Sequence, residues 1–318
     1  MDISPASQTV GVVGLGMVGG TVARAFSEAD VTVRGYDRYL QIGSPKDLRD
    51  CGVVFLCVPT PSLPNRGYNL EEVWSAVHEI EPHLQAGTIV VVKSTVSPGT
   101  NDRLAAAWPH LEFAALPEFL VEARPLETFT NPDRIIIGTR ASEAANILRD
   151  LLAKVAPEAP AIVVRPIEAE LTKLCSNVLL AAKVAMANQL ADICDGYGAS
   201  WARVKSVVAL DRRIGPDHLT VTEERGFGGS CLPKDLDGLI AAAEAIGCRP
   251  QLLETIAEFN RHVRAQAEAE HSNTNGAPQE TSNGNPSPAG LLELALVDES
   301  HGLDIRDPVG GPPRGSRS

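Results

Sequence analysis

The sequence has few aromatic residues, and one end of it has none. Only 4% of its 318 residues are Phe, Trp or Tyr, and the last of them is Phe259. Of the twenty residues 271–290, sixteen are Ser, Thr, Asn, Gln, Gly or Pro. Such a composition buries too little apolar surface to offset the entropy lost on ordering. We therefore predict a disordered C-terminal tail over residues 265–318.

Three further absences exclude whole classes of protein. The 28 Lys and Arg are outnumbered by 40 Asp and Glu, for a net charge of −12, which argues against nucleic acid as a partner. No run of 18 apolar residues occurs, and the N-terminus lacks the pattern of a secretory signal, so we expect no membrane segment. The six cysteines form no CxxC pair and no zinc-like spacing, which predicts reduced thiols, a cytoplasmic protein and no metal site.

The first half of the sequence alternates between strand-like and helix-like segments. We expect strands at residues 9–13, 31–36, 53–58, 88–92, 113–116, 134–137 and 161–164. We expect helices between them at residues 18–27, 70–84 and 142–155. Such alternation is typical of an α/β fold, here a Rossmann-type doubly wound parallel sheet over residues 1–165.

The second half is purely helical in pattern. We expect helices at residues 167–197, 201–210, 236–246 and 252–263. The sequence therefore predicts an all-helical central domain over residues 166–264, placed between the sheet domain and the tail.

A glycine-rich motif follows the first predicted strand. Gly14, Gly16 and Gly19 form a G-x-G-x-x-G pattern around Met17 and Val18, at the start of a predicted helix. These glycines permit a tight turn and let the backbone approach a pyrophosphate. A purely structural glycine turn is the alternative interpretation.

The second predicted strand ends at Asp37, 18 residues after Gly19. An acidic residue there accepts hydrogen bonds from a ribose 2′-hydroxyl and repels a 2′-phosphate, which favours NAD as the cofactor. Arg38 is the neighbour that could favour NADP instead, unless it is a solvated surface residue.

The most unusual segment is Gly226-Phe-Gly-Gly-Ser-Cys-Leu-Pro-Lys-Asp235. Three glycines surround Cys231, and Lys234 follows it closely. A nearby cation makes a thiol a better nucleophile. Chemistry alone leaves two interpretations of Cys231 open, a reactive thiol in a loop and a buried structural cysteine.

At this point the sequence resembles the UDP-glucose/GDP-mannose 6-dehydrogenase family, over roughly residues 8–264. The matching segments, besides the one around Cys231, are Val58-Pro-Thr-Pro61, Ser94-Thr-Val96 with Pro98-Gly-Thr100, Pro117-Glu-Phe-Leu-x-Glu122, Asn131-Pro-Asp-Arg134, Glu168-Ala-Glu-Leu-Thr-Lys173 with Asn177, and Asp211-x-Arg-Ile-Gly215.

The resemblance implies a four-electron, NAD-dependent oxidation of a primary alcohol to a carboxylate. Cys231 would form a thiohemiacetal and then a thioester with the substrate, and Glu118 would assist the water that hydrolyses it. Lys173 and Asn177 would stabilise oxyanions. Because these two residues lie four apart on a predicted helix, they share one face of it.

The remaining implied roles concern proton transfer and binding. Asp235, with Lys173, would handle the alcohol proton through a water that Thr95 helps to hold. The implied cofactor-binding residues are Gly14, Gly16, Met17, Val18, Gly19, Asp37, Arg38, Thr60, Thr95, Glu122 and Lys234. The implied substrate-binding residues are Glu118, Phe119, Leu120, Lys173, Asn177, Arg213, Phe227, Gly228 and Cys231.

The sequence also departs from the family pattern. Leu116, Ala123 and the segment 222–225 differ from the family in the wall of the substrate cleft. The family continues into a second Rossmann-like domain that binds the nucleotide, whereas 54 residues follow Arg264 here. We therefore expect a short member without that domain, acting on a nucleotide sugar or on a smaller nucleotide or sugar alcohol.

Two other functions remain open from the sequence. A two-electron dehydrogenase of the hydroxy-acid type would make Cys231 incidental, and a non-catalytic NAD-binding subunit would need none of the catalytic residues. In the family the long helix at 167–197 forms a dimer core. A helix of that length needs burial, so we expect a homodimer.

Overall fold

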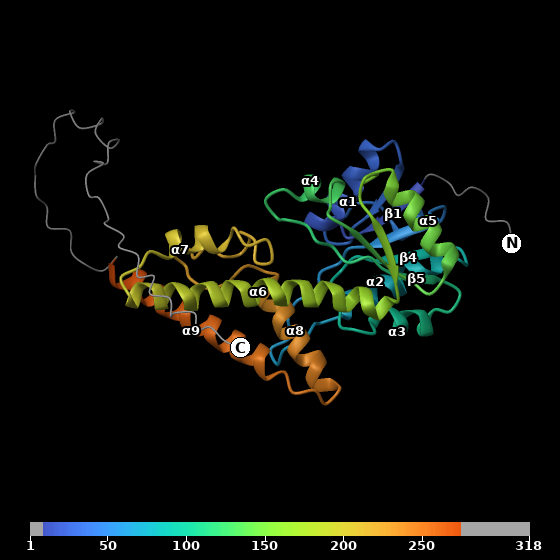
Figure 1. Ribbon diagram of the computed structural model, residues 1–318. Coiled ribbons are helices and arrows are strands. Elements are labelled where there is room, and N and C mark those ends of the chain that lie inside the picture. The colour runs from blue at the N-terminus through green and yellow to red at the C-terminus, as the bar shows by residue number, and fades with distance from the viewer. Residues whose placement is uncertain (1–8, 275–318) are drawn as a thin grey trace, which may run out of the picture. The chain divides into compact units, whose positions relative to one another are not determined.

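Seven strands form one sheet, and each begins and ends within two residues of a predicted strand. We describe residues 9–274 from a computed structural model (Figure 1). The sheet order is β2-β1-β3-β4-β5-β6-β7. The strands are β1 (Thr9–Val13), β2 (Thr32–Tyr36), β3 (Val53–Leu56), β4 (Ile89–Val92), β5 (Glu112–Ala115), β6 (Ile135–Gly138) and β7 (Ala161–Val164).

One strand pair differs from the predicted parallel sheet. Strands β5 and β6 are antiparallel, joined by a single bridge between Ala115 and Gly138, whereas every other pair is parallel. The connection from β5 to β6 contains only the six-residue helix α4 (Pro125–Thr130). A parallel return usually runs back along the sheet as an α-helix, and the six residues of α4 are too short to provide one.

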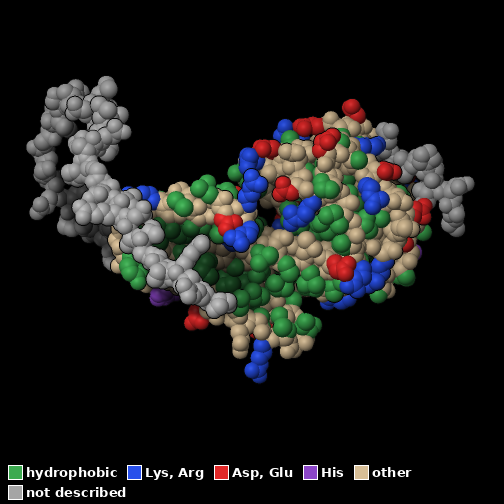
Figure 2. Space-filling view, in the orientation of Figure 1, with side chains coloured by type: hydrophobic (Ala, Val, Ile, Leu, Met, Phe, Trp, Pro, Cys, Tyr) green, Lys and Arg blue, Asp and Glu red, His purple; other side chains and the backbone are tan. Residues whose placement is uncertain are grey.

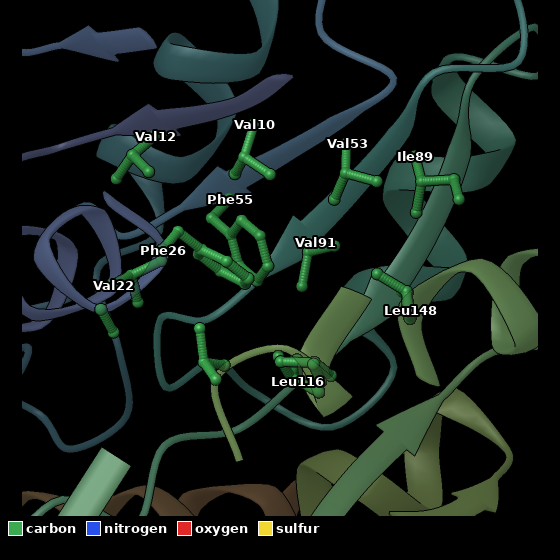
Figure 3. Packing of buried hydrophobic residues seen from close by; sticks show 14 of the residues in the cluster. Val10, Val12, Val22, Phe26, Val53, Phe55, Ile89, Val91, Leu116 and Leu148 are labelled. Atoms are coloured by element: carbon green, nitrogen blue, oxygen red, sulfur yellow. The ribbon is translucent and has the colours of Figure 1, made fainter. Parts of the chain in front are cut away.

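The central strands are buried on both faces. Phe55 and Val91 pack on one side of the sheet, and Val54 and Val90 pack on the other. Successive side chains of a strand point to opposite faces, so these all-apolar strands supply two hydrophobic layers. Figure 3 shows the first layer, where Phe26 of a covering helix lies beside Phe55, with 5.4 Å between ring centroids.

Helices cover both layers. Side chains from α1 (Met17–Glu28), α4 and α5 (Ser142–Ala153) enter the first layer. Side chains from α2 (Glu71–Ile80), α3 (Thr100–Ala107) and the short 3₁₀ helix η1 (Pro45–Leu48) enter the second. A second 3₁₀ turn, η2 (Glu81–His83), continues α2. Helices α3 and α4 were not predicted, because each buries a single apolar side chain, Leu104 and Phe129, and so shows no apolar period.

Four helices follow the sheet domain. They are α6 (Pro166–Gly196), α7 (Trp201–Val208), α8 (Leu232–Ala245) and α9 (Gln251–Thr274). Helix α6 packs against α8 and α9 (Figure 1). Their shared core includes Val178, Leu236 and Ile240.

Helix α9 extends beyond the expected end of the folded part. It continues past Arg264 to Thr274, so the predicted start of the disordered tail at 265 is too early. Residues 265–270 read Ala-Gln-Ala-Glu-Ala-Glu, and all of these are good helix formers. The rest of the predicted tail, residues 275–318, lies outside the described residues.

Helix α6 is long and apolar enough to meet the length and hydropathy criteria of a membrane-spanning helix. It also carries Glu170, Lys173 and Asn177 on a buried face. All three side chains bond to partners within the protein. Paired buried polar groups of this kind indicate a core helix of the folded protein.

Candidate active and cofactor site

The glycine motif forms the turn between β1 and α1. Gly14 has a φ of 82°, in the left-handed region that favours glycine. A Cβ added to Gly19 would overlap the carbonyl oxygen of Gly14. Helix α1 begins after Gly16 without a side-chain cap, and Met17 is exposed in its first turn. Its first N–H groups are therefore free to bind a phosphate.

Asp37 lies at the end of β2, beside this turn. Its carboxylate accepts hydrogen bonds from the backbone N–H groups of Leu15 at 2.7 Å and of Tyr39 and Leu40 at 2.9 Å each. Burial works to raise the pKa of Asp37, but these three donors outweigh it and hold the pKa below its ordinary value. An ionised acid at this position suits a ribose diol and disfavours a 2′-phosphate.

Arg38 is occupied by neighbouring side chains. It donates to Glu72 at 2.5 Å and to Ser75 at 2.9 Å, and its guanidinium lies over the ring of Tyr39. Arg38, Tyr39 and Glu72 line a cavity of about 340 Å³ together with Gly14 and Asp37. The glycine turn, the open helix start and this acid-lined cavity fit the adenosine half of NAD.

The ends of β3 and β4 are tied together beside this cavity. Thr60 donates its hydroxyl to the carbonyl of Thr95 at 2.7 Å, and Ser94 donates to the carbonyl of Val58 at 2.6 Å. Thr95 also lines a small cavity of about 230 Å³ with Lys173 of α6. Thr60 and Thr95 therefore lie between the cofactor turn and the face of α6 that carries Lys173.

Glu118 and Lys173 form a buried ion pair. The Lys173 ammonium donates to Glu118 Oε1 at 2.9 Å, and the backbone N–H of Leu120 donates to Oε2 at 2.8 Å. Burial works to raise the pKa of Glu118, but the charge and hydrogen bond of Lys173, the Leu120 N–H and the charge of Lys93 hold it below its ordinary value.

Lys93, directly after β4, is a buried residue of this site that the sequence motifs did not indicate. Lys93 is 4% exposed, and its ammonium lies 5.3 Å from the ring centroid of Phe129. Burial is the main cause that lowers the pKa of Lys93 to about 8, while the Glu118 carboxylate opposes it. The position of Lys93 directly before the Ser94-Thr95 motif was the one feature of the sequence that could have indicated a role in the site. A single lysine in a sequence is far more often exposed to solvent, so this feature is weak.

The ring of Phe119 lies close to two cationic side chains near this ion pair. Its ring centroid is 4.8 Å from the Arg134 guanidinium and 5.5 Å from the Lys173 ammonium. The segment after β5 therefore brings Glu118 and Phe119 to α6. Leu120 lies beside them and is half-buried.

One turn along α6, Asn177 binds Asp235 of α8. The Asn177 amide donates to Asp235 Oδ2 at 2.5 Å, and both side chains are buried. Lys234 donates to the other carboxylate oxygen at 3.0 Å. Because Lys173 and Asn177 occupy adjacent turns of one helix, the Glu118 pair and the Asp235 pair lie next to each other.

Tyr68, which the sequence motifs did not indicate, is a further hydrogen-bond donor to Asp235. Its hydroxyl donates to Asp235 Oδ1 at 3.0 Å. The two residues are 167 positions apart in the sequence, and no spacing rule connects them. Only the folded chain brings the loop between β3 and α2 to α8.

Cys231 is the residue immediately before α8. Its thiol is exposed, and its carbonyl accepts the N–H of Asp235 at 2.9 Å, so the two residues are one helical turn apart. The hydroxyl of Ser230 lies 3.5 Å from its sulfur. The geometry favours the exposed-thiol interpretation of Cys231 over that of a buried structural cysteine.

Four predicted site residues lie apart from this cluster. Glu122 is exposed, and Arg213 is exposed and paired with Asp211 at 2.6 Å. Phe227 is buried in the core of the helical domain, where its backbone N–H and C=O bind the side chain of Asn260 at 2.7 and 2.9 Å. Gly228 is exposed beside Arg264.

Across residues 9–274, no group of three or more His, Cys, Asp or Glu is arranged to hold a metal ion.

Comparisons with known proteins match both halves of the described chain. The NAD binding domain of the UDP-glucose/GDP-mannose dehydrogenase family matches residues 38–156, and the central domain of that family matches residues 167–262. A solved UDP-glucose dehydrogenase from Pyrobaculum islandicum is 30% identical with a TM-score of 0.74, covering 82% of this chain and 70% of that one.

Curated relatives are similar over the same region. A UDP-glucose 6-dehydrogenase of Rickettsia typhi is 34% identical over 220 residues, which are 68% of this chain and 50% of that protein. The UDP-glucose 6-dehydrogenase YwqF of Bacillus subtilis is 33% identical over 227 residues, 69% of this chain and 51% of that protein. The chain thus spans about half the length of the curated relatives it matches.

Proposed function

This chain belongs to the UDP-glucose/GDP-mannose dehydrogenase family, and we propose that it oxidises a primary alcohol to a carboxylate with NAD. One observation carries the proposal: Lys173 and Asn177 of α6 bring Glu118 and Asp235 together in a buried cluster, one turn of α8 from the thiol of Cys231. Two acids, a lysine and a thiol are the groups that such an oxidation requires.

The first half of the reaction converts the alcohol to an aldehyde. Asp235 takes up the alcohol proton through a water, and Lys173 donates to the developing oxyanion. When bound, NAD accepts the hydrogen that leaves the substrate carbon together with its electron pair. The glycine turn and Asp37 would hold the adenosine half of NAD. Thr60 and Thr95 would line the part of the site between that turn and α6.

The second half converts the aldehyde to the acid. The Cys231 thiolate adds to the aldehyde carbon, and Asn177 and Lys173 stabilise the oxyanion of the thiohemiacetal. The thioester forms as this carbon loses a second hydride to bound NAD. Glu118 then assists a water that attacks the thioester, which releases the carboxylate and restores the thiol. One alcohol and one water are consumed, and two NADH are produced.

The substrate class we propose is a nucleotide sugar. The relatives at 33–34% identity carry the name UDP-glucose 6-dehydrogenase, and the chain matches about half of their length. UDP-glucose is therefore the first substrate to test, followed by smaller nucleotide and sugar alcohols.

We propose that the protein is a homodimer joined along α6. Exposed apolar side chains on this helix include Leu179 at 67%, Met186 at 60% and Ile193 at 49%. In Figure 2 hydrophobic side chains gather along the middle of this helix. An exposed apolar face of this extent marks a protein interface. Arg213, exposed and remote from the cluster of its own chain, would then be available to a neighbouring active site.

We further propose a cytoplasmic location. All six cysteines are free, although their number would permit three disulfides. A chain that keeps every thiol reduced suits a reducing compartment.

The test is a product assay with UDP-glucose and NAD. The expected result is two NADH per product, and a carboxylate by mass spectrometry. The Cys231→Ser variant should release aldehyde and no acid, while Cys248→Ser, which alters another exposed thiol, should behave as the wild type. One NADH per product would instead indicate a two-electron dehydrogenase. NAD binding without any turnover would indicate a binding subunit.

A further inference from the structure

We propose that Tyr68 is a positioning residue for this reaction, which holds the carboxylate of Asp235 in its working orientation. The inference rests on the proposed function, because it adds a role to a site whose activity is itself a proposal. Tyr68 belongs to the loop between β3 and α2, outside the motifs that carry the family resemblance.

The geometry places Tyr68 and Asn177 on opposite oxygens of one carboxylate. Tyr68 donates to Oδ1 at 3.0 Å, and Asn177 donates to Oδ2 at 2.5 Å. Asp235 is 1% exposed and Tyr68 is 5% exposed, so bulk solvent does not compete for these bonds. A carboxylate with a donor on each oxygen cannot rotate about its χ2 bond without breaking both.

Helix α8 is shaped to accept the phenol. Gly238 lies in the interior of α8, where glycine destabilises a helix by about 1 kcal/mol relative to alanine. A Cβ at this position would overlap the ring and hydroxyl of Tyr68. The glycine therefore makes the room that lets the tyrosine reach Asp235, one turn earlier on the same helix.

The loop that carries Tyr68 is anchored on both sides. Ser62 and Tyr68 form an antiparallel bridge, and Leu63 donates its N–H to the carbonyl of Gly67 at 3.0 Å. Outside the site, Arg66 lies within 3.5 to 3.9 Å of three carboxylates of α8 and α9: Asp237, Glu244 and Glu254. The loop is thus docked on the helical domain rather than free in solvent.

Tyr68 acts as a donor and not as an acid. Burial first, and then the charge of Asp235, raise the pKa of its phenol well above the ordinary value. The Lys234 ammonium lies 4.5 Å from the ring centroid and also donates to Asp235 Oδ1. The phenol therefore keeps its proton and donates it in a hydrogen bond to the Asp235 carboxylate.

The test compares Tyr68→Phe with Tyr197→Phe, which removes a hydroxyl from an exposed tyrosine at the end of α6. With UDP-glucose as the probe, Tyr68→Phe should lower kcat about 10- to 100-fold, the effect of losing one hydrogen bond to a charged group. The KM for NAD should stay within about twofold of wild type, because the cofactor residues are untouched. Tyr197→Phe should match the wild type in both parameters.

A second readout separates positioning from a general structural loss. Supplied with the 6-aldehyde of UDP-glucose, Tyr68→Phe should form acid at close to the wild-type rate, because that half-reaction begins after the alcohol proton has left. Equal losses with alcohol and aldehyde would overturn the inference.

Gly238→Ala provides an independent variant that keeps the phenol but displaces it. It should reproduce the selective loss of alcohol oxidation. An active wild type with both variants unimpaired overturns the role of Tyr68 alone. A wild type that binds NAD but oxidises no alcohol overturns the proposed function and removes the basis of this inference with it.

Discussion

Lys173 donates to Glu118 across 2.9 Å, at a place where their side chains are only 6% and 13% exposed. Burial of a charge is unfavourable, and the attraction between the two charges offsets this cost only while both are present. An unpaired buried charge destabilises the folded state by several kcal/mol. This ion pair joins the segment after β5 to the first buried turns of α6, so its loss should affect stability as well as the proposed chemistry.

Lys173→Met should lower the free energy of unfolding by about 3–5 kcal/mol at pH 7. Denaturant titration measures this loss. Lys154→Met changes an exposed lysine after α5 and should shift the free energy by less than about 0.5 kcal/mol. A Lys173→Met variant as stable as the Lys154→Met control would show that the pair is not formed.

The stability difference between wild type and Lys173→Met should also depend on pH. In the wild type the pKa of Glu118 is lowered from 4.5. Its contribution is therefore complete above that value and is lost as the pH falls through the lower folded pKa. In the variant, the Leu120 N–H and the charge of Lys93 still lower the pKa of Glu118, but Lys173 no longer helps to oppose burial. The pKa of Glu118 is therefore higher than in the wild type, and protonation in acid relieves part of the cost of its burial. The difference should be largest near pH 7 and narrow towards pH 4, and a difference that widens in acid would contradict this account.

Glu170→Ala should destabilise the start of α3. The carboxylate of Glu170 accepts the backbone N–H groups of Gly99 and Asn101 at 2.5 and 2.9 Å and the Asn101 amide at 2.8 Å. Its removal leaves three donors without a partner, at a cost of about 2–4 kcal/mol. Thermal unfolding of Glu170→Ala and of the exposed control Asp195→Ala measures the effect. Equal melting temperatures would refute it.

Asp37→Asn should weaken the preference for NAD over NADP. The wild type should bind NADH more tightly than NADPH, because Asp37 repels a 2′-phosphate while Arg38 is neutralised by Glu72. Removal of the Asp37 charge should reduce the ratio of the NADPH Kd to the NADH Kd about tenfold. Both dissociation constants can be measured from the fluorescence of the bound cofactors. Asp30→Asn is the control: Asp30 is exposed, with a φ of 56° that Asn tolerates. An unchanged ratio in Asp37→Asn would mean that Asp37 does not select the cofactor.

Met186→Glu should separate the proposed dimer. Met186 is 60% exposed on α6, and a charge in the centre of an apolar interface is strongly unfavourable. Sedimentation should find a dimer for the wild type and a monomer for this variant. Ile246→Glu alters an equally apolar residue, 82% exposed after α8, and should remain dimeric. A monomeric wild type would overturn the proposed dimer.

The sheet was largely predictable because its signal is local. Runs such as Val53–Leu56 are apolar throughout, and a strand buried on both faces has to be. The direction of β6 was not predictable, since it depends on how the short segment around α4 returns to the sheet. The end of α9 was misjudged for the opposite reason: composition biased the prediction towards disorder, although the residues before Thr274 include good helix formers.

By itself the sequence determined the seven strands of the sheet, the described α-helices other than α3 and α4, and the glycine turn before α1. It also contained the motifs that carry Glu118, Lys173, Asn177, Cys231 and Asp235. Apolar periodicity and turn geometry depend on residues that are close together in the sequence, so they can be predicted from the sequence alone. Only the tertiary structure decided that Lys93 faces Glu118, that Phe227 is core, and that Tyr68 reaches Asp235 through the space at Gly238. These contacts join residues that are far apart in the sequence. They depend on how the whole chain packs, which no local sequence pattern encodes.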